Sequence, residues 1–158
     1  MTPARKIEAL TPVVKLRERR LDLARQAAAQ AQEAVATAAG LQARAEAAVV
    51  SAEDEARQLD VWFAEQLSGS AAVIQAGLAR RETLAAAKTQ AAHDRDAARD
   101  TLDAARAILA DAIAVLMRAE GRRDAMRDQL SGARAQRLSD REEREQLELE
   151  DLSRRRAW

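Results

Sequence analysis

The chain has 158 residues, of which 2% are aromatic, 5 are Gly, 2 are Pro and none is Cys. Ala, Leu, Arg, Glu and Gln dominate, and all of these are strong helix formers. This composition argues against a compact α/β enzyme, a β-sandwich or a disulfide scaffold, because these folds need bulky, β-branched, turn-forming or Cys residues. The 26 Lys and Arg balance 26 Asp and Glu, so the whole chain lacks the basic excess typical of proteins that bind nucleic acid or anionic membranes.

Two kinds of local signal divide the chain. Thr2-Pro3 and Thr11-Pro12 each combine an N-cap residue with a Pro suited to the first helical position. They predict a short N-terminal arm over 1–11 and a helix over 12–67. Ser68, Gly69 and Ser70 are small turn formers between two long periodic segments, so they predict a turn over 68–71.

An apolar stripe, in steps of three and four residues, predicts the buried face of the first helix. Arg20 interrupts the stripe, and the mean step of about 3.6 predicts a nearly straight helix. The stripe comprises Leu16, Leu23, Ala27, Ala31, Ala34, Ala38, Leu41, Ala45, Ala48, Ala52, Ala56, Leu59 and Phe63.

A regular heptad predicts a second helix over 72–133. Its positions alternate in steps of four and three from Leu84 to Ala133: Leu84, Lys88, Ala91, Arg95, Ala98, Leu102, Ala105, Leu109, Ala112, Leu116, Ala119, Arg123, Met126, Leu130 and Ala133. Such a repeat indicates a coiled coil, and a short turn makes the two helices antiparallel neighbours. The predicted fold is all-α: a single elongated domain over 1–158, two long helices in an antiparallel coiled-coil hairpin, with a charged C-terminal helical overhang over 134–158.

The residues give no basis for a catalytic, cofactor or metal site, and we expect the chain not to be an enzyme. His93 is the only His, it lies off the heptad core, and no Cys is present. The carboxylates alternate with Arg at helical spacings, which is typical of a solvated face. Neither a Sec-type signal nor a membrane span is predicted, so we expect a cytoplasmic protein.

An apolar cluster surrounds the predicted turn. A two-helix tip cannot bury all of these side chains, because each helix has only one neighbour. The cluster therefore either staples the hairpin tip or forms an exposed patch that binds a partner. The candidate partner-binding residues are Leu59, Trp62, Phe63, Leu67, Val73, Ile74 and Leu78.

Three features resemble the FliJ/YscO-like family of central-stalk proteins of type III secretion ATPases. They are the opening VVKLRERRLDLARQAAAQAQEA (Val13 to Ala34), the turn region Ser68-Gly69-Ser70, and the tail REEREQLELEDLSRRR (Arg141 to Arg156). The layout matches over essentially the whole chain.

The resemblance implies a non-enzymatic central stalk without cofactors, which inserts into a hexameric secretion ATPase and contacts the export gate. Some members also bind export chaperones. It implies a cytoplasmic location beside the inner-membrane secretion apparatus, of either a virulence or a flagellar system. The alternatives from the residues alone are a structural coiled-coil spacer or scaffold, or a small export-chaperone adaptor; no contact with nucleic acid is expected in either case.

Under this resemblance the turn end would contact the export gate and the overhang would enter the ATPase ring. The overhang beyond Leu130 has no partner helix, so only one helix and a short arm must pass the pore. Its alternating charges suit weak, distributed contacts with polar pore walls. The candidate residues at this end are Arg137, Leu138, Arg141, Arg144, Glu145, Glu148, Leu149 and Leu152.

Overall fold

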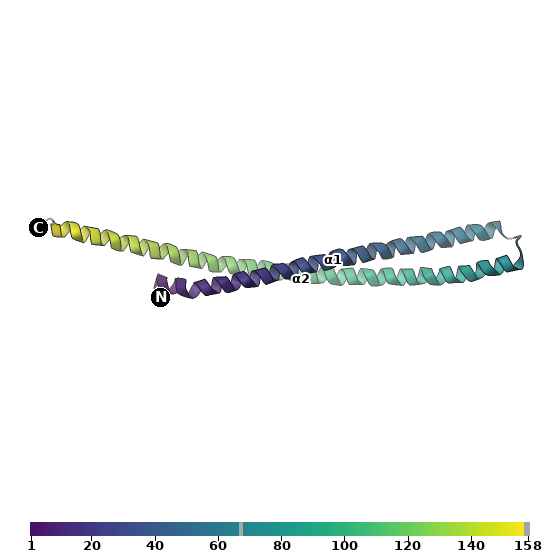
Figure 1. Cartoon of the computed structure of the whole chain (residues 1–158), viewed down its shortest axis with the longest axis horizontal. Coiled ribbons are helices and arrows are strands. Elements are labelled where there is room, and N and C mark those ends of the chain that lie inside the picture. The colour runs from purple at the N-terminus through teal and green to yellow at the C-terminus, as the bar shows by residue number, and fades with distance from the viewer. Residues whose placement is uncertain (67, 157–158) are drawn as a thin grey trace. The chain divides into compact units, whose positions relative to one another are not determined.

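The structure, a computed structural model, describes residues 1–66 and 68–156 and contains two long α-helices (Figure 1). Helix α1 spans Pro3–Glu65 and helix α2 spans Ala71–Arg156. The described residues contain no strand, which confirms the predicted all-α class. None of these helices has a stretch that is long and apolar enough to cross a membrane.

Helix α1 begins at Pro3, so the boundary expected between an arm and a helix at residue 12 is not observed. The first Thr-Pro pair is the real start, since the Lys6 N–H donates a hydrogen bond to the Thr2 carbonyl at 3.1 Å. The helix continues through Pro12, which lacks an N–H. Thr11 precedes it and donates its hydroxyl to the Ile7 carbonyl at 2.7 Å.

The connection between the helices lies where the small residues predicted a turn. Helix α1 ends at Glu65, and the Gly69 N–H donates to the Gln66 carbonyl at 2.8 Å. Ser70 caps α2, because its carbonyl accepts the Ile74 N–H at 3.1 Å. Leu67, where the sequence places the end of the first helix, lies outside the described residues.

The sheltered face of α1 matches the predicted stripe only in part. The stripe positions that are buried or half-buried are Ala31, Ala38, Ala45, Ala52, Ala56, Leu59 and Phe63, and the others are exposed. Leu16, Leu23 and Leu41 are 46%, 64% and 49% exposed, whereas Leu21 is 1% exposed. The sheltered positions alternate strictly in steps of four and three, the repeat of about 3.5 typical of a left-handed coiled coil rather than a straight helix. Buried or half-buried positions on this seam are Pro3, Ile7, Leu10, Val14, Arg17, Leu21, Ala24, Ala28, Ala31, Val35, Ala38, Gln42, Ala45, Val49, Ala52, Ala56, Leu59 and Phe63.

The seam of α2 follows the predicted heptad. Leu84, Leu102, Ala105, Leu130 and Ala133 are buried, and the intervening heptad positions are half-buried. Lys88 is the exception, because it is exposed. A lysine on a seam can turn its flexible stem and carry the ammonium group into water.

The chain divides into two units, each made of segments from both helices. Unit 1 comprises residues 1–28 and 112–158, and unit 2 comprises residues 29–111. In unit 1, Arg127 contacts Glu18, and Arg25 lies 3.8 Å from Glu120.

Unit 2 has a thin core and its own ion pairs between the helices. Ala38 of α1 packs with Leu102 and Ala105 of α2. Arg80 and Arg81 of α2 lie 3.5 and 3.4 Å from Glu55 and Asp60 of α1. In each unit, therefore, residues that are distant in the sequence meet across two helices.

Candidate functional site

The apolar cluster beside the turn has a packed side and an exposed side. The rings of Trp62 and Phe63 meet edge to face, with centroids 5.3 Å apart at an interplanar angle of 74°. Both rings are half-buried and lie against the backbone of Gly77 in α2. A Cβ at Gly77 would lie 2.6 Å from the Phe63 Cζ atom and 2.7 Å from the Trp62 Cζ3 atom. The two aromatic side chains therefore staple the two helices next to the turn.

The remaining cluster residues show which side chains stay available to a partner. Leu59 and Ile74 are half-buried, and Leu67 lies outside the described residues. Val73 is 37% exposed and Leu78 is 49% exposed. Val61, which directly precedes Trp62 in α1, is 60% exposed. The exposed tip patch thus consists of Val61, Val73 and Leu78.

Gly77 is a residue that the sequence analysis missed. It lies in a helical segment, where Gly is less favourable than Ala by about 1 kcal/mol. A Gly inside an apolar helical stretch usually has a packing reason. The Gly in this stretch was the sequence signal for the contact. Without a side chain, Gly77 gives the two bulky aromatic residues of α1 a flat surface on α2.

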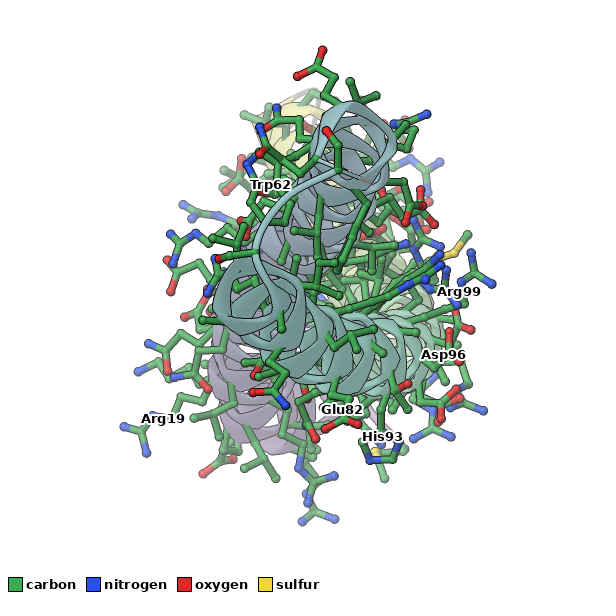
Figure 2. All side chains as sticks on the ribbon, turned by 90° about the vertical axis from the view of Figure 1, so that its right-hand side faces the viewer. Arg19, Trp62, Glu82, His93, Asp96 and Arg99 are labelled. Atoms are coloured by element: carbon green, nitrogen blue, oxygen red, sulfur yellow. The ribbon has the colours of Figure 1, made fainter. Side chains whose placement is uncertain are left out.

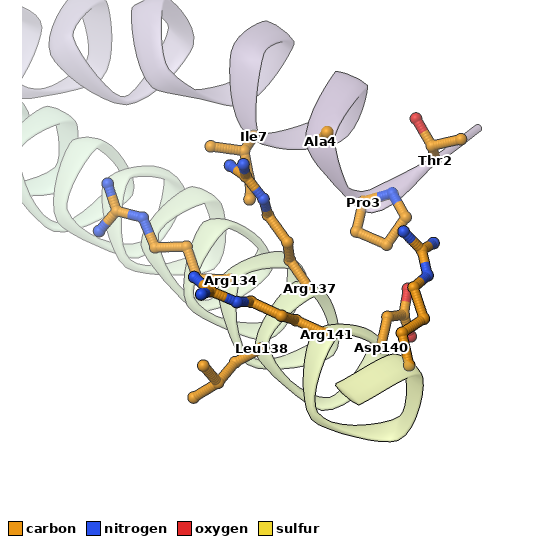
Figure 3. Close-up of a pocket in the computed structure, with 10 residues that line it drawn as sticks. Thr2, Pro3, Ala4, Ile7, Arg134, Arg137, Leu138, Asp140 and Arg141 are labelled. Atoms are coloured by element: carbon orange, nitrogen blue, oxygen red, sulfur yellow. The ribbon is translucent and has the colours of Figure 1, made fainter. Parts of the chain in front are cut away.

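Unit 1 contains an open groove between the first turns of α1 and the C-terminal part of α2. Thr2, Pro3, Ala4 and Ile7 form one wall. Figure 3 shows Arg137 reaching from α2 toward Ile7. The other wall comprises Arg134, Arg137, Leu138, Asp140, Arg141 and Arg144.

All eight residues predicted for this end are exposed. Leu138, Leu149 and Leu152 are 59%, 66% and 56% exposed. Arg141 donates from Nε to the Glu145 Oε1 atom at 2.8 Å. Of the eight, Arg137, Leu138, Arg141 and Arg144 line the groove, while Glu145, Glu148, Leu149 and Leu152 continue along α2 beyond it.

A second groove in unit 1, which the sequence analysis did not identify, collects four arginines. Two come from each helix: Arg17 and Arg20 from α1, and Arg118 and Arg122 from α2, above a floor that includes Ala24 and Ala119. We call these four residues the arginine groove. The zero net charge of the whole chain gave no sign of this basic cluster, because acidic residues elsewhere in the chain balance its positive charge.

Charge is in fact divided unequally between the units. Unit 1 holds 18 Arg and Lys against 13 Asp and Glu, a net charge of +5, and unit 2 holds 8 against 13, a net charge of −5. Counting charge by structural unit, rather than over the whole chain, would have revealed this signal.

The described residues offer no metal-binding group of three or more His, Cys, Asp or Glu side chains. His93 is exposed, and Figure 2 shows it at the periphery of α2 together with Asp96 and Arg99. The exposed tip patch and the two grooves are candidate surfaces for binding other molecules. No family model, curated protein or solved structure matches this chain.

Proposed function

We propose that this chain is a non-enzymatic central stalk of a type III secretion ATPase complex, of a virulence or a flagellar system. It inserts one end into the hexameric ATPase and contacts the export gate with the other, at the cytoplasmic side of the inner-membrane apparatus. The observation that carries this proposal is the unequal length of the two helices, 63 residues in α1 and 86 in α2. The surplus leaves α2 with an exposed, charged single-helix extension.

The proposal includes an antiparallel coiled-coil hairpin formed by α1 and α2. The continuous seam on each helix supports it, because heptad seams pack against one another. The order of the contacts also supports it. Glu18 and Arg25 of α1 contact Arg127 and Glu120 of α2, and Glu55 contacts Arg80, so the partner numbers fall as the α1 numbers rise.

In this proposal, the exposed residues at each end of the hairpin indicate which partner that end binds. The extension beyond the groove carries Glu145, Glu148, Leu149 and Leu152 on one helix with no described contact to α1, which suits passage through a narrow ring. The exposed tip patch is small and apolar, which suits docking onto a protein such as the export gate. Export chaperones are further candidate partners for exposed faces of the hairpin.

ATP turnover by the purified hexameric secretion ATPase tests this function. The full chain is expected to co-purify with the ATPase and to raise its ATP turnover when added. The variant Arg137→Glu with Arg144→Glu is expected to lose stimulation, because both residues lie at the inserting end. The matched control is Lys88→Glu with Arg99→Glu, which makes the same charge change at two exposed positions in unit 2.

The alternative functions predict a different result. A structural spacer, a scaffold or an export-chaperone adaptor also needs the two long helices but has no reason to alter ATP turnover. An ATPase whose turnover is the same with and without the full chain would therefore contradict the stalk. Equal loss of stimulation in the Lys88 and Arg99 control would show that stimulation depends on overall charge and not on this end.

A further inference from the structure

The arginine groove lacks counter-charges within its own chain. Among the described residues, none of its four guanidinium groups lies within ion-pair distance of a carboxylate. Glu18 and Glu120, the acids next to the groove in sequence, are already paired with Arg127 and Arg25. Four like charges that converge on one groove repel each other, so an anionic occupant would relieve that repulsion.

Apolar side chains beside the groove indicate what kind of anion it would take. Leu16 and Leu23 lie one helical turn before and after Arg20, and they are 46% and 64% exposed. Val115 lines the groove from α2 and is 48% exposed. A helix that carries both carboxylates and leucines matches this mixed surface better than a small inorganic anion does.

The chain itself contains such a helix. Residues 140–152 of α2, here called the acidic overhang, hold 7 Asp and Glu against 2 Arg, a net charge of −5. Leu147, Leu149 and Leu152 are 62%, 66% and 56% exposed. Within the described part of the chain, the only ion pair of this segment joins Arg141 to Glu145.

The acidic overhang cannot reach the arginine groove of its own molecule. Both lie in unit 1 on the same uninterrupted helix α2, and Arg118 and Glu148 are separated by about 45 Å along its axis at 1.5 Å per residue. Only a second copy of the chain can bring the two surfaces together.

We propose that the acidic overhang of one copy docks in the arginine groove of a second copy, and that the exchange is reciprocal. Each copy then contributes one groove and one overhang, so the contact closes as a two-fold symmetric dimer. The carboxylates of the overhang neutralise the four arginines, and its leucines cover Leu16, Leu23 and Val115.

The dimer shares the overhang with the end that is proposed to enter the ATPase ring, but the two proposals have separate tests. The dimer is tested by oligomeric state with changes at Arg118, Arg122, Glu148 and Asp151, and stimulation by ATP turnover with changes at Arg137 and Arg144, so either proposal can fail without the other. The dimer also covers the end that is proposed to enter the ATPase ring. The dimeric and the ring-inserted states therefore exclude one another.

Light scattering and sedimentation of the full chain, with two charge-reversed variants, test the dimer. The groove variant is Arg118→Glu with Arg122→Glu, and the overhang variant is Glu148→Arg with Asp151→Arg. Each variant alone is expected to be monomeric, because the groove variant leaves two Arg and two Glu in the groove, and the overhang variant leaves 5 Asp and Glu against 4 Arg in the overhang. In each case one of the two surfaces is nearly neutral and the attraction is lost. An equimolar mixture is expected to associate, because the unchanged overhang of the groove variant then meets the unchanged groove of the overhang variant.

Two controls complete the experiment. The variant Lys88→Glu with Arg99→Glu is expected to remain dimeric, and circular dichroism is expected to show full helicity in every variant. Raising the salt from about 0.1 M to about 1 M is expected to dissociate the wild-type dimer, because the screening length falls from about 10 Å to about 3 Å.

Three results would overturn the proposal. One is a wild-type chain that stays monomeric at all concentrations. The second is a groove variant that dimerises as well as the wild type. The third is a mixture of the two reversed variants that fails to associate although both are folded.

Discussion

Among the glycines, Gly77 is the one at which an added Cβ would meet the shortest contacts. Replacing it with Ala places a Cβ within 2.7 Å of both aromatic rings, so the rings must shift. We expect Gly77→Ala to lower the free energy of unfolding by about 1–3 kcal/mol, the range for overpacked sites. Urea or thermal denaturation followed by circular dichroism measures this change.

The chain offers a matched control for that substitution. Gly40 lies inside α1 and has nothing within 4 Å of the position that a Cβ would take. Gly40→Ala is therefore expected to stabilise the protein by about 0.5–1 kcal/mol, because Ala favours helix over Gly. A Gly77→Ala variant that gains stability like the control would show that the rings do not rest on Gly77.

Leu21 and Leu23 are two residues apart and therefore lie on different faces of α1, so they distinguish the observed seam from the expected stripe. Leu21 is 1% exposed and Leu23 is 64% exposed. We expect Leu21→Ala to cost about 2–4 kcal/mol, as for large-to-small changes in a core, and Leu23→Ala to cost less than about 0.5 kcal/mol. Chemical denaturation compares them, and equal losses in the two variants would contradict the observed seam.

At the scale of the element, the C-terminal part of α2 is separable from the rest of the helix. A chain that ends after Ala133 loses residues that are nearly all exposed. In high salt, where contacts between exposed charges are screened, its thermal melting is expected to shift little from that of the full chain. It is also expected to lose stimulation of the secretion ATPase, measured as ATP turnover.

The same truncation can also contradict this assignment. Binding through the exposed tip patch is expected to survive, because Val61, Val73 and Leu78 remain. A truncated chain that stimulates the ATPase as well as the full chain would show that this end is not inserted. A chain that no longer melts cooperatively would show that residues after Ala133 hold the helices together.

Most of the secondary structure was predictable, because the two helices depend on strong local signals. The composition, the heptad from Leu84 to Ala133 and the small residues at Ser68–Ser70 correspond to two helices and the connection between them. The seam of α1 was predicted correctly from Ala52 to Phe63 and at Ala31, Ala38 and Ala45, but its other positions were missed for a physical reason. Its strict heptad includes Arg17, Ala28 and Gln42, so the larger leucines on a neighbouring face gave a more obvious, but exposed, stripe.

The candidate surfaces were predictable only in part. The apolar cluster near the turn was evident from its composition, but the division between packed rings and an exposed patch depends on Gly77, whose role appears only in three dimensions. The arginine groove joins residues about 100 positions apart, and no local pattern connects Arg17 and Arg20 with Arg118 and Arg122. Such convergence follows from the pairing of the helices and not from spacing along either one.

At the scale of the whole molecule, the stalk proposal predicts that the two ends act independently. Val61→Ser with Leu78→Ser is expected to weaken binding to the export gate and to leave ATPase stimulation unchanged. Arg137→Glu with Arg144→Glu is expected to do the reverse. Pull-down with the gate protein and ATP turnover measure the two activities, and joint loss of both in either variant would contradict independent ends.

The small side chains along the seam have a consequence for the alignment of the helices. Many seam positions of α1 are Ala. If one helix moved along the other by seven residues, most Ala layers would meet a side chain of similar size again. The bulky positions, such as Leu21, Leu102, Leu130 and the rings on Gly77, are expected to resist axial sliding of one helix past the other more than the Ala layers do. These few side chains set the register, so replacing them with Ala would free the helices to slip by seven residues while most layers still fit.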